Sequence, residues 1–375
     1  VLVRVIWPLV TPALAAGAAL AFVSCIGNFG IPAFLGIPAN YLVLPTLIYR
    51  ELSGFGSSAI PTATMLSLLV SILAGLGVLV QHRFANKGHF KVTPSRAADA
   101  PFVLERARVW VELTLLVLLL VLLLAPLSAL LAKSLAPAPG VPLTWASATA
   151  EHYVYVLQGN DATVRAFVNS IGMSVTAAAV LAVVALLMAY LMEYRKSPWL
   201  KRLDYLIEVP YVLPGVVLSI AMILLYLKPV FGISLYNTIG IIFLAYLARF
   251  LAIQLRPIIG GFQQLPVEML EAAEVFGAPF LRRLRIIVIP LLLPSVTAGA
   301  MLVVLLALNE LTISALLWSS GSETLGVAVF NLEQGGESAA AAAIGMVSVV
   351  VANLIMLLAS IAGRRLPSGV LPWRA

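Results

Sequence analysis

Apolar runs of about 20 residues recur along this chain and leave few folds open to it. A helix of that length crosses the hydrocarbon core of a bilayer, which is roughly 30 Å thick. Hydrophobic residues make up 62% of the 375 residues and charged residues only 10%, whereas a soluble domain is about half apolar and about a quarter charged. The pattern predicts an all-α fold, a polytopic bundle of transmembrane helices.

Run length places eight spans on the chain. They cover residues 9–27, 59–81, 109–132, 167–192, 205–227, 238–256, 291–315 and 339–363. Two further apolar segments, 41–52 and 323–334, each lie between an outward-going and an inward-going span. Each is either a short helix that dips into the membrane against protein or a helix at the membrane surface, and both alternatives stay open.

Basic residues predict the orientation of these spans, because Lys and Arg concentrate in short cytoplasmic loops. With the N-terminus inside, eighteen of the twenty-three Lys and Arg residues fall in cytoplasmic segments, four fall outside, and Arg249 falls within a span. We therefore expect both termini in the cytoplasm. The net charge of +7 comes from the basic residues of these short loops. It does not indicate a nucleic-acid partner, because the basic residues do not gather on one soluble face.

The chain contains an internal repeat with an offset of 282 residues. When 8–36 is placed on 290–318, ten of the 29 positions are identical, and these include two prolines and one glycine. Both copies start inside, so the repeat is parallel, with its axis along the membrane normal. The pattern predicts four regions, which are the last part of a first repeat (1–81), a cytoplasmic linker (82–108), a complete six-span second repeat (109–363) and a cytoplasmic tail (364–375). We expect that the first repeat lacks about four spans on its N-terminal side.

One predicted cytoplasmic segment, "EAAEVFGAPFLRRLRIIVIPLLLP" (271–294), carries charges between apolar runs. Its first part has the spacing of a short amphipathic helix, with acids near the N-terminal end where the helix dipole favours them. Ala272 and Ala273 are small and would allow close approach of another protein. Gly277 is expected to end or bend the helix. Such a helix is suited to lie in a groove of a cytoplasmic partner.

These residues resemble the loop of the MetI-like permease subunits of ATP-binding-cassette importers. The pattern of that family is E-A-A, three residues, G, nine residues, then I-x-L-P. Here it reads Glu271-Ala272-Ala273, then Gly277, then a segment that ends at Pro290, with isoleucine in place of leucine just before the proline. In the first copy, "VIWP" (5–8) falls where I-x-L-P would be. Within the family the duplicated layout looks most like the fused ferric iron permeases.

The resemblance implies a function and a set of partners. The loop would dock on an ATP-binding subunit, two of which would act on the cytoplasmic side. A periplasmic substrate-binding protein would deliver the substrate, most often ferric iron in this subfamily, to a permease in the bacterial inner membrane surrounded by lipid. Thiamine, sulfate and polyamine systems share the fold and remain alternative substrates. No cofactor or bound metal is implied.

Polar residues within the spans are candidates for the substrate path, because a charge near the bilayer centre costs about 3 kcal/mol or more unless it has a partner or faces a cavity. Glu310 and Asn309 lie together in the seventh span, and the repeat places Asn28 opposite Glu310. They either line a path along the pseudo-two-fold axis or clasp neighbouring helices. Glu208 precedes two prolines in the fifth span, which either let the helix bend during gating or fix a kink in it. Arg249 either pairs with a carboxylate or, as we favour, snorkels to the inner headgroups.

Two other functions are alternatives for a membrane protein of this kind. A stand-alone secondary transporter or channel would not need the charged loop. An enzyme would need a base or metal ligands within the spans, but the three histidines lie in loops and the single cysteine has no histidine beside it. No phosphate-binding loop of the G-x-x-x-x-G-K-S/T type occurs, so any ATP hydrolysis is expected in a partner subunit.

Overall fold

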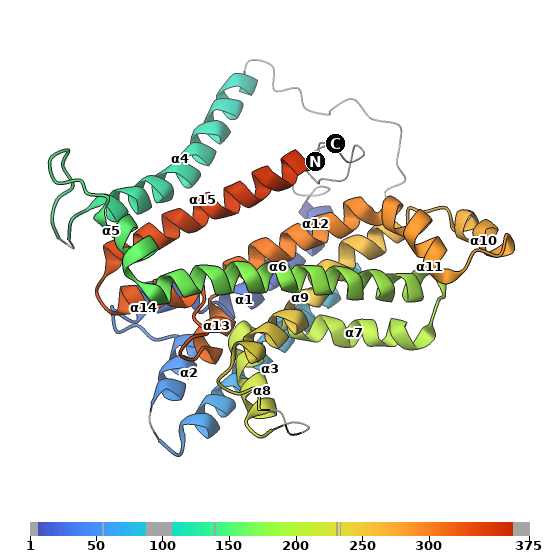
Figure 1. The fold of residues 1–375 in the computed structure, drawn as a ribbon, viewed down its shortest axis with the longest axis horizontal. Helices are drawn as coiled ribbons and strands as arrows, with labels where there is room; N and C mark the ends of the chain where they lie inside the picture. The colour runs from blue at the N-terminus through green and yellow to red at the C-terminus, as the bar shows by residue number, and fades with distance from the viewer. Residues whose placement is uncertain are drawn as a thin grey trace.

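The computed structural model describes residues 7–54, 56–87, 107–138, 140–229, 232 and 234–362. In these residues the secondary structure is helical, without strands. The "VI" of the predicted first-copy motif (5–6), most of the linker and the cytoplasmic tail lie outside the described residues. Helices fill all eight predicted spans, as Figure 1 shows.

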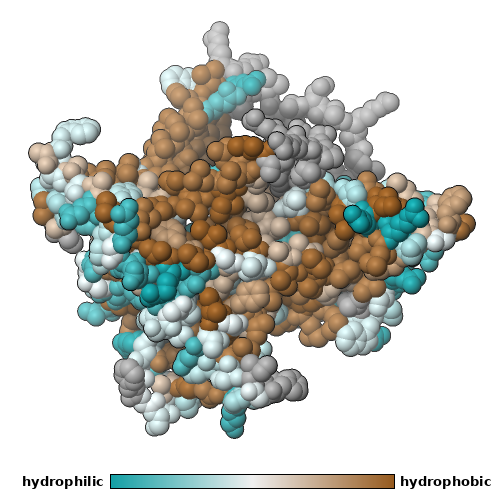
Figure 2. All heavy atoms as spheres, viewed as in Figure 1, coloured by the Kyte–Doolittle hydropathy of each residue, from teal (hydrophilic) through white to brown (hydrophobic). Residues whose placement is uncertain are grey.

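The long helices are α1 (Trp7–Ile26), α3 (Ala59–Lys87), α4 (Ala107–Leu135), α6 (Asp161–Ala189), α9 (Ile239–Phe262), α12 (Ile289–Leu308) and α15 (Ser338–Ala362). Six helical segments of the described residues are long and apolar enough to cross a membrane, and a bent pair makes a seventh. In α1 the apolar stretch Leu14–Ile26 is shorter. Hydrophobic residues cover most of the face seen in Figure 2, and hydrophilic residues gather towards its margins.

Shorter elements connect these helices. They are α2 (Leu44–Ser53), α5 (Glu151–Val154), α7 (Pro198–Val212), α8 (Gly215–Tyr226), α10 (Val267–Val275), α11 (Phe280–Arg283), α13 (Thr312–Leu317) and α14 (Leu325–Gln334). Within the described residues, four π-helical segments join or extend them, namely η2 (Pro32–Gly36), η3 (Tyr155–Gly159), η4 (Tyr190–Tyr194) and η5 (Leu284–Val288). The two apolar outer segments predicted from sequence are thus both ten-residue helices, α2 and α14.

The fifth predicted span is not one helix. It divides into α7 and α8, whose axes meet at 108°. Proline disfavours helical geometry in the residue before it, and Leu213 accordingly has extended backbone (φ −63°, ψ 137°). Pro214 is itself extended at ψ 138° and starts α8 as its N-cap. Pro210, by contrast, stays within α7, so the second proline alone marks the break.

The seventh predicted span is also shorter than its apolar run. The helix α12 ends at Leu308, and α13 begins at Thr312 after a break. The polar pair Asn309 and Glu310 lies in this break, where Glu310 hydrogen-bonds to the backbone that follows it. A side chain that bonds its own backbone offers the chain an alternative to a continued helix.

The structure has the repeat that the sequence predicts. The first residues of α1 and α12 are 282 positions apart in the sequence, and so are their last residues. Each of these helices is followed by a break, a short helix and then α2 or α14. Tyr49 of α2 and Phe330 of α14 occupy equivalent places within these two ten-residue helices. Their rings meet at 5.4 Å and 89°, and Phe29 and Phe34 join the same cluster against Phe330. The ten-residue helices of the two repeats thus contact each other through this aromatic cluster.

Candidate functional site

The helix α10 ends in a turn that explains the spacing between the alanines and the glycine of the loop motif. The N–H of Ala278 donates to the carbonyl of Ala273 at 2.9 Å, and the N–H of Gly277 donates to that of Glu274 at 2.9 Å. This pair of bonds is a Schellman motif. It places Gly277 at φ +75°, a conformation that L side chains disfavour. The expected end of the helix at Gly277 is confirmed.

A buried leucine fixes one face of α10 to the bundle. Leu270 is only 2% exposed and packs in a cluster with Phe262 at the end of α9, Val288 in η5 and Leu292 in α12. The loop is therefore seated on the adjoining ends of the two helices that flank it in the sequence.

A charged group fixes the other end of α10. The carboxylate of Glu274 accepts a hydrogen bond from the hydroxyl of Tyr194 at 2.7 Å and another from the guanidinium of Arg283. Arg195 lies 3.9 Å from the same carboxylate, and the Arg283 guanidinium stacks 5.9 Å from the ring of Tyr194. The bond from Tyr194 and that from Arg283 hold the pKa of the Glu274 carboxyl below its usual range. The sequence did not single out this cluster, because Tyr194 and Arg195 lie about 80 residues before Glu274 in the chain.

The remaining face of the loop is uncovered. Glu271 and Ala272 are exposed, and Ala273 is half-buried. Beside them Val275 is 85% exposed and Phe276 is 89% exposed. Sequence reasoning missed these two apolar residues, although two large apolar side chains just before the helix-ending glycine were a visible signal. Pro290, the last motif residue, begins α12 as one of its first two residues, where its missing N–H is not needed.

The two predicted path residues at equivalent positions have the same structural role. The side-chain oxygen of Asn28 accepts the N–H of Ile31 at 3.2 Å. The carboxylate of Glu310 accepts the N–H of Ile313 at 2.8 Å and that of Ser314 at 3.3 Å. Each side chain thus bonds the start of the short helix that follows the break, and its role in a substrate path or in a clasp between helices stays a prediction.

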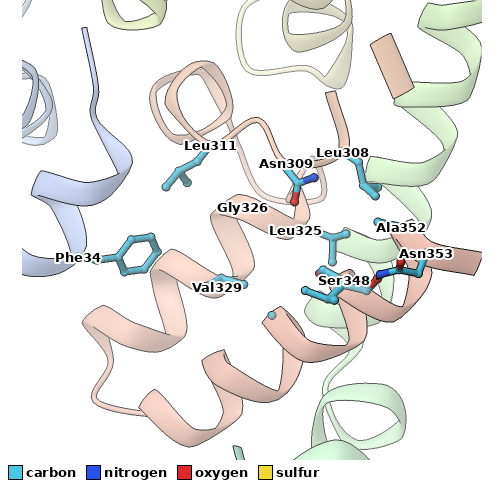
Figure 3. A pocket seen from close by; sticks show the side chains of 12 residues that line it. Phe34, Leu308, Asn309, Leu311, Leu325, Gly326, Val329, Ser348, Ala352 and Asn353 are labelled. Carbon is cyan, nitrogen blue, oxygen red and sulfur yellow. The ribbon is translucent and has the colours of Figure 1, made fainter. Parts of the chain in front are cut away.

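Asn309, the neighbour of Glu310, lines a cavity of about 350 Å³ between α12, α14 and α15. Figure 3 shows it on one side of that cavity, with Ser348 and Asn353 of α15 below and Phe34 of the first repeat across from them. The amide of Asn309 also donates to the carbonyl of Leu305 at 2.9 Å. Neither Asn28 nor Glu310 lines this cavity.

Glu208 lies apart from the other predicted path residues. Its carboxylate pairs with Arg256 of α9, which also holds Asp204 at 3.1 Å. This cluster joins α7 to α9, and a role of Glu208 in the substrate path stays a prediction.

Three breaks in the helices meet at one place. A Cβ added at Gly27, after α1, would lie 2.9 Å from Cβ of Pro214 between α7 and α8. A Cβ added at Gly215 would lie 3.0 Å from Cγ2 of Thr312, where α13 begins. Arg249 of α9 donates to the carbonyl of Leu213 at 3.0 Å, so its guanidinium lies beside the same break. The expectation that Arg249 snorkels to the headgroups is wrong.

Comparison with known proteins agrees with this architecture. A family model described as "Binding-protein-dependent transport system inner membrane component" matches residues 181–368, half of the chain. The chain belongs to this family. It is thus a multi-pass protein of the inner membrane, and the resemblance read from the loop motif is confirmed.

Some relatives are longer than this chain, which spans about half to two thirds of their length, and the relatives are named for different substrates. It is 29% identical to the probable ABC transporter permease protein y4fN of Sinorhizobium fredii, over 94% of this chain and 62% of that protein. It is 25% identical to the ferric transport system permease protein FbpB of Actinobacillus pleuropneumoniae, over 94% of this chain and 51% of that protein. It is also 25% identical to the spermidine/putrescine permease protein PotC of Escherichia coli, over 58% of this chain and 80% of that protein.

A solved structure supports the fold. The chain superposes with a TM-score of 0.54 on a bacterial ABC transporter involved in the import of the acidic polysaccharide alginate. The match covers 70% of this chain and 97% of the other, at 17% sequence identity. The predicted MetI-like fold is thereby confirmed.

Proposed function

We propose that this chain is the membrane-spanning part of an ATP-driven importer, which passes its substrate from a periplasmic binding protein to the cytoplasm. The observation that carries the proposal is the exposed side of α10, formed by Glu271, Ala272 and Val275 together with Phe276 just after the helix, while the other side is fixed by Leu270. Large apolar side chains on a soluble loop are typical of a docking surface. Two ATP-binding subunits would dock on such loops, and ATP would be hydrolysed there. A stand-alone transporter has no use for this surface.

Ferric iron is the substrate that we propose, with both termini of the chain in the cytoplasm. The similarity to the ferric permease FbpB, which extends over 94% of this chain, supports iron. The similarity to PotC, which covers 80% of that protein, makes a polyamine the second candidate. Thiamine and sulfate remain further alternatives.

The test is transport by the full-length permease, reconstituted in proteoliposomes with its ATP-binding subunits and binding protein. Uptake of radiolabelled ferric iron should depend on ATP, and spermidine uptake should stay at background. Uptake of spermidine in place of iron would overturn the iron proposal. Uptake that does not need the ATP-binding subunits would overturn the importer proposal. Binding of these subunits to wild type and Glu271→Arg tests the docking surface separately.

A further inference from the structure

A cavity of about 200 Å³ lies where the helix breaks meet. Residues of α1, α3, α9 and the break between α7 and α8 line it, so both repeats contribute to its wall. Ser24, Gln81 and Tyr211 give it polar groups, and Arg249 is its single charged residue among the described residues. The cavity therefore presents one positive charge to anything that enters it.

Arg249 lies near the middle of α9, a helix long enough to span the membrane. A charge there is costly unless partners surround it. Its guanidinium has five N–H donors, and one nitrogen donates to the carbonyl of Leu213. No ion pair of the described residues includes it. Glu310 attracts it through space, but that carboxylate is bound to backbone N–H groups and does not line the cavity.

The twelve-residue helix α8 begins at the same cavity. The first N–H groups of a helix have no partner within it. Those of Val217 and Leu218 bond the carbonyl of Pro214, and the described residues give Gly215 and Val216 no such backbone acceptor. In broken membrane helices, half-helix N-termini point at anionic groups of the substrate. The N-terminus of α8 and the guanidinium of Arg249 thus both present positive charge to the same small cavity.

We infer that Arg249 and the first turn of α8 form an oxyanion-binding site within the membrane, on the path of the substrate. This inference rests on the proposed transport function and narrows its substrate class. The cavity is smaller than the roughly 300–1,000 Å³ of a drug-sized pocket, so it fits a phosphate, sulfate or carboxylate group. A ferric ion would cross as a complex whose oxyanion ligands face Arg249. A polyamine has the wrong charge for this site.

Iron uptake tests the site in the reconstituted full-length transporter, with ferric citrate as the substrate. We expect Arg249→Gln to lower uptake at least tenfold and Arg249→Lys, which keeps the charge, to restore part of it. Arg256→Gln is the matched control, because Arg256 lies two turns further along α9, pairs with carboxylates and does not line the cavity. It should retain most of the uptake. Equal losses in the Arg249→Gln and Arg256→Gln variants would overturn the inference.

Anion binding tests the site without transport. Millimolar sodium phosphate should raise the unfolding temperature of the detergent-solubilised wild type relative to sodium chloride of equal ionic strength. We expect Arg249→Gln to lose this rise and Arg256→Gln to keep it. A purely structural role of Arg249, as a cap of α7, would lower the unfolding temperature in both salts and leave the difference between them unchanged, and that result would refute the site.

The two proposals fail in different ways. If wild type takes up no iron but phosphate still stabilises it through Arg249, the oxyanion site stands and iron is the wrong substrate. If iron uptake is normal in Arg249→Gln, iron stands and the oxyanion site is wrong.

Discussion

Replacing Phe276 by alanine should weaken the binding of the ATP-binding subunits without affecting the stability of the permease. In the free chain this side chain is 89% exposed, so its loss leaves no cavity. If docking buries it fully, the lost hydrophobic contribution is about 1.5–3 kcal/mol. Since about 1.4 kcal/mol corresponds to a tenfold change in affinity, we expect the dissociation constant to rise about 10- to 150-fold.

The assay measures the affinity of purified ATP-binding subunits for the permease in nanodiscs, together with the unfolding temperature of each variant. Leu270→Ala provides the contrast, because Leu270 is 2% exposed and its truncation should cost about 2–5 kcal/mol of stability. Trp145→Ala, in an exposed segment on the predicted outer side, should change neither quantity.

The reasoning is refuted if Phe276→Ala binds the subunits as tightly as wild type. That result would mean that Phe276 stays uncovered in the complex or inserts among lipid headgroups, and the docking surface would have to lie elsewhere. A fall in unfolding temperature for Phe276→Ala would equally contradict the structure, because a side chain so exposed has little packing to lose.

Three further predictions concern the loop and the packing of the bundle. Gly277→Ala should destabilise the loop by about 1–2 kcal/mol through its left-handed backbone, measurable as faster proteolysis of the loop. Glu274→Gln should lower the unfolding temperature at neutral pH, because the folded-state pKa of this carboxyl lies below its unfolded value. Its stabilising contribution is complete above pH ~4.3 and lost as the pH falls through the folded pKa, so wild type and variant should converge in acid. Gly261→Ala should lower the stability of the permease by about 1–3 kcal/mol through overpacking, since the added Cβ would lie 2.4 Å from Oγ of Ser295. Gly260→Ala is the control, because a Cβ added there meets nothing within 4 Å, and it should leave the unfolding temperature unchanged.

The sequence was sufficient for the helical fold and the repeat because both depend on local pattern. An apolar run of sufficient length has no alternative to a helix in lipid, and an identical offset between two segments predicts identical elements. It was insufficient for the breaks. The two prolines predicted a bend or a kink in the fifth span, but hydropathy continues unchanged across Pro214, and the observed backbone alone shows that the turn reaches 108°. Asn309 and Glu310 were recognised as unusual, but not as the point where α12 ends.

The same distinction between local pattern and distant contacts applies to the site residues. Gly277 was predicted as a helix end because a Schellman turn is local. The contacts of Glu274 and Arg249 were not predictable, because each depends on a segment far away in the chain: Glu274 on Tyr194, and Arg249 on the carbonyl of Leu213. Arg249 was assigned to the headgroups on the general behaviour of long basic side chains. Tertiary structure instead supplied an acceptor within the span.

The loop and the proposed oxyanion site are connected by two helices. On one side of the loop, α9 runs without a break from Arg249 to Phe262, just before α10. On the other side, α12 begins at the loop and ends where Asn309 and Glu310 interrupt it. These two helices pack against each other, with Gly299 allowing the close approach of Gln254. A displacement of α10 by a docked subunit would therefore act, through rigid elements, on the place where the helix breaks meet. Coupling through such elements requires two discrete arrangements at the far end, and we expect the second arrangement of the backbone at the breaks beside Pro214 and Glu310.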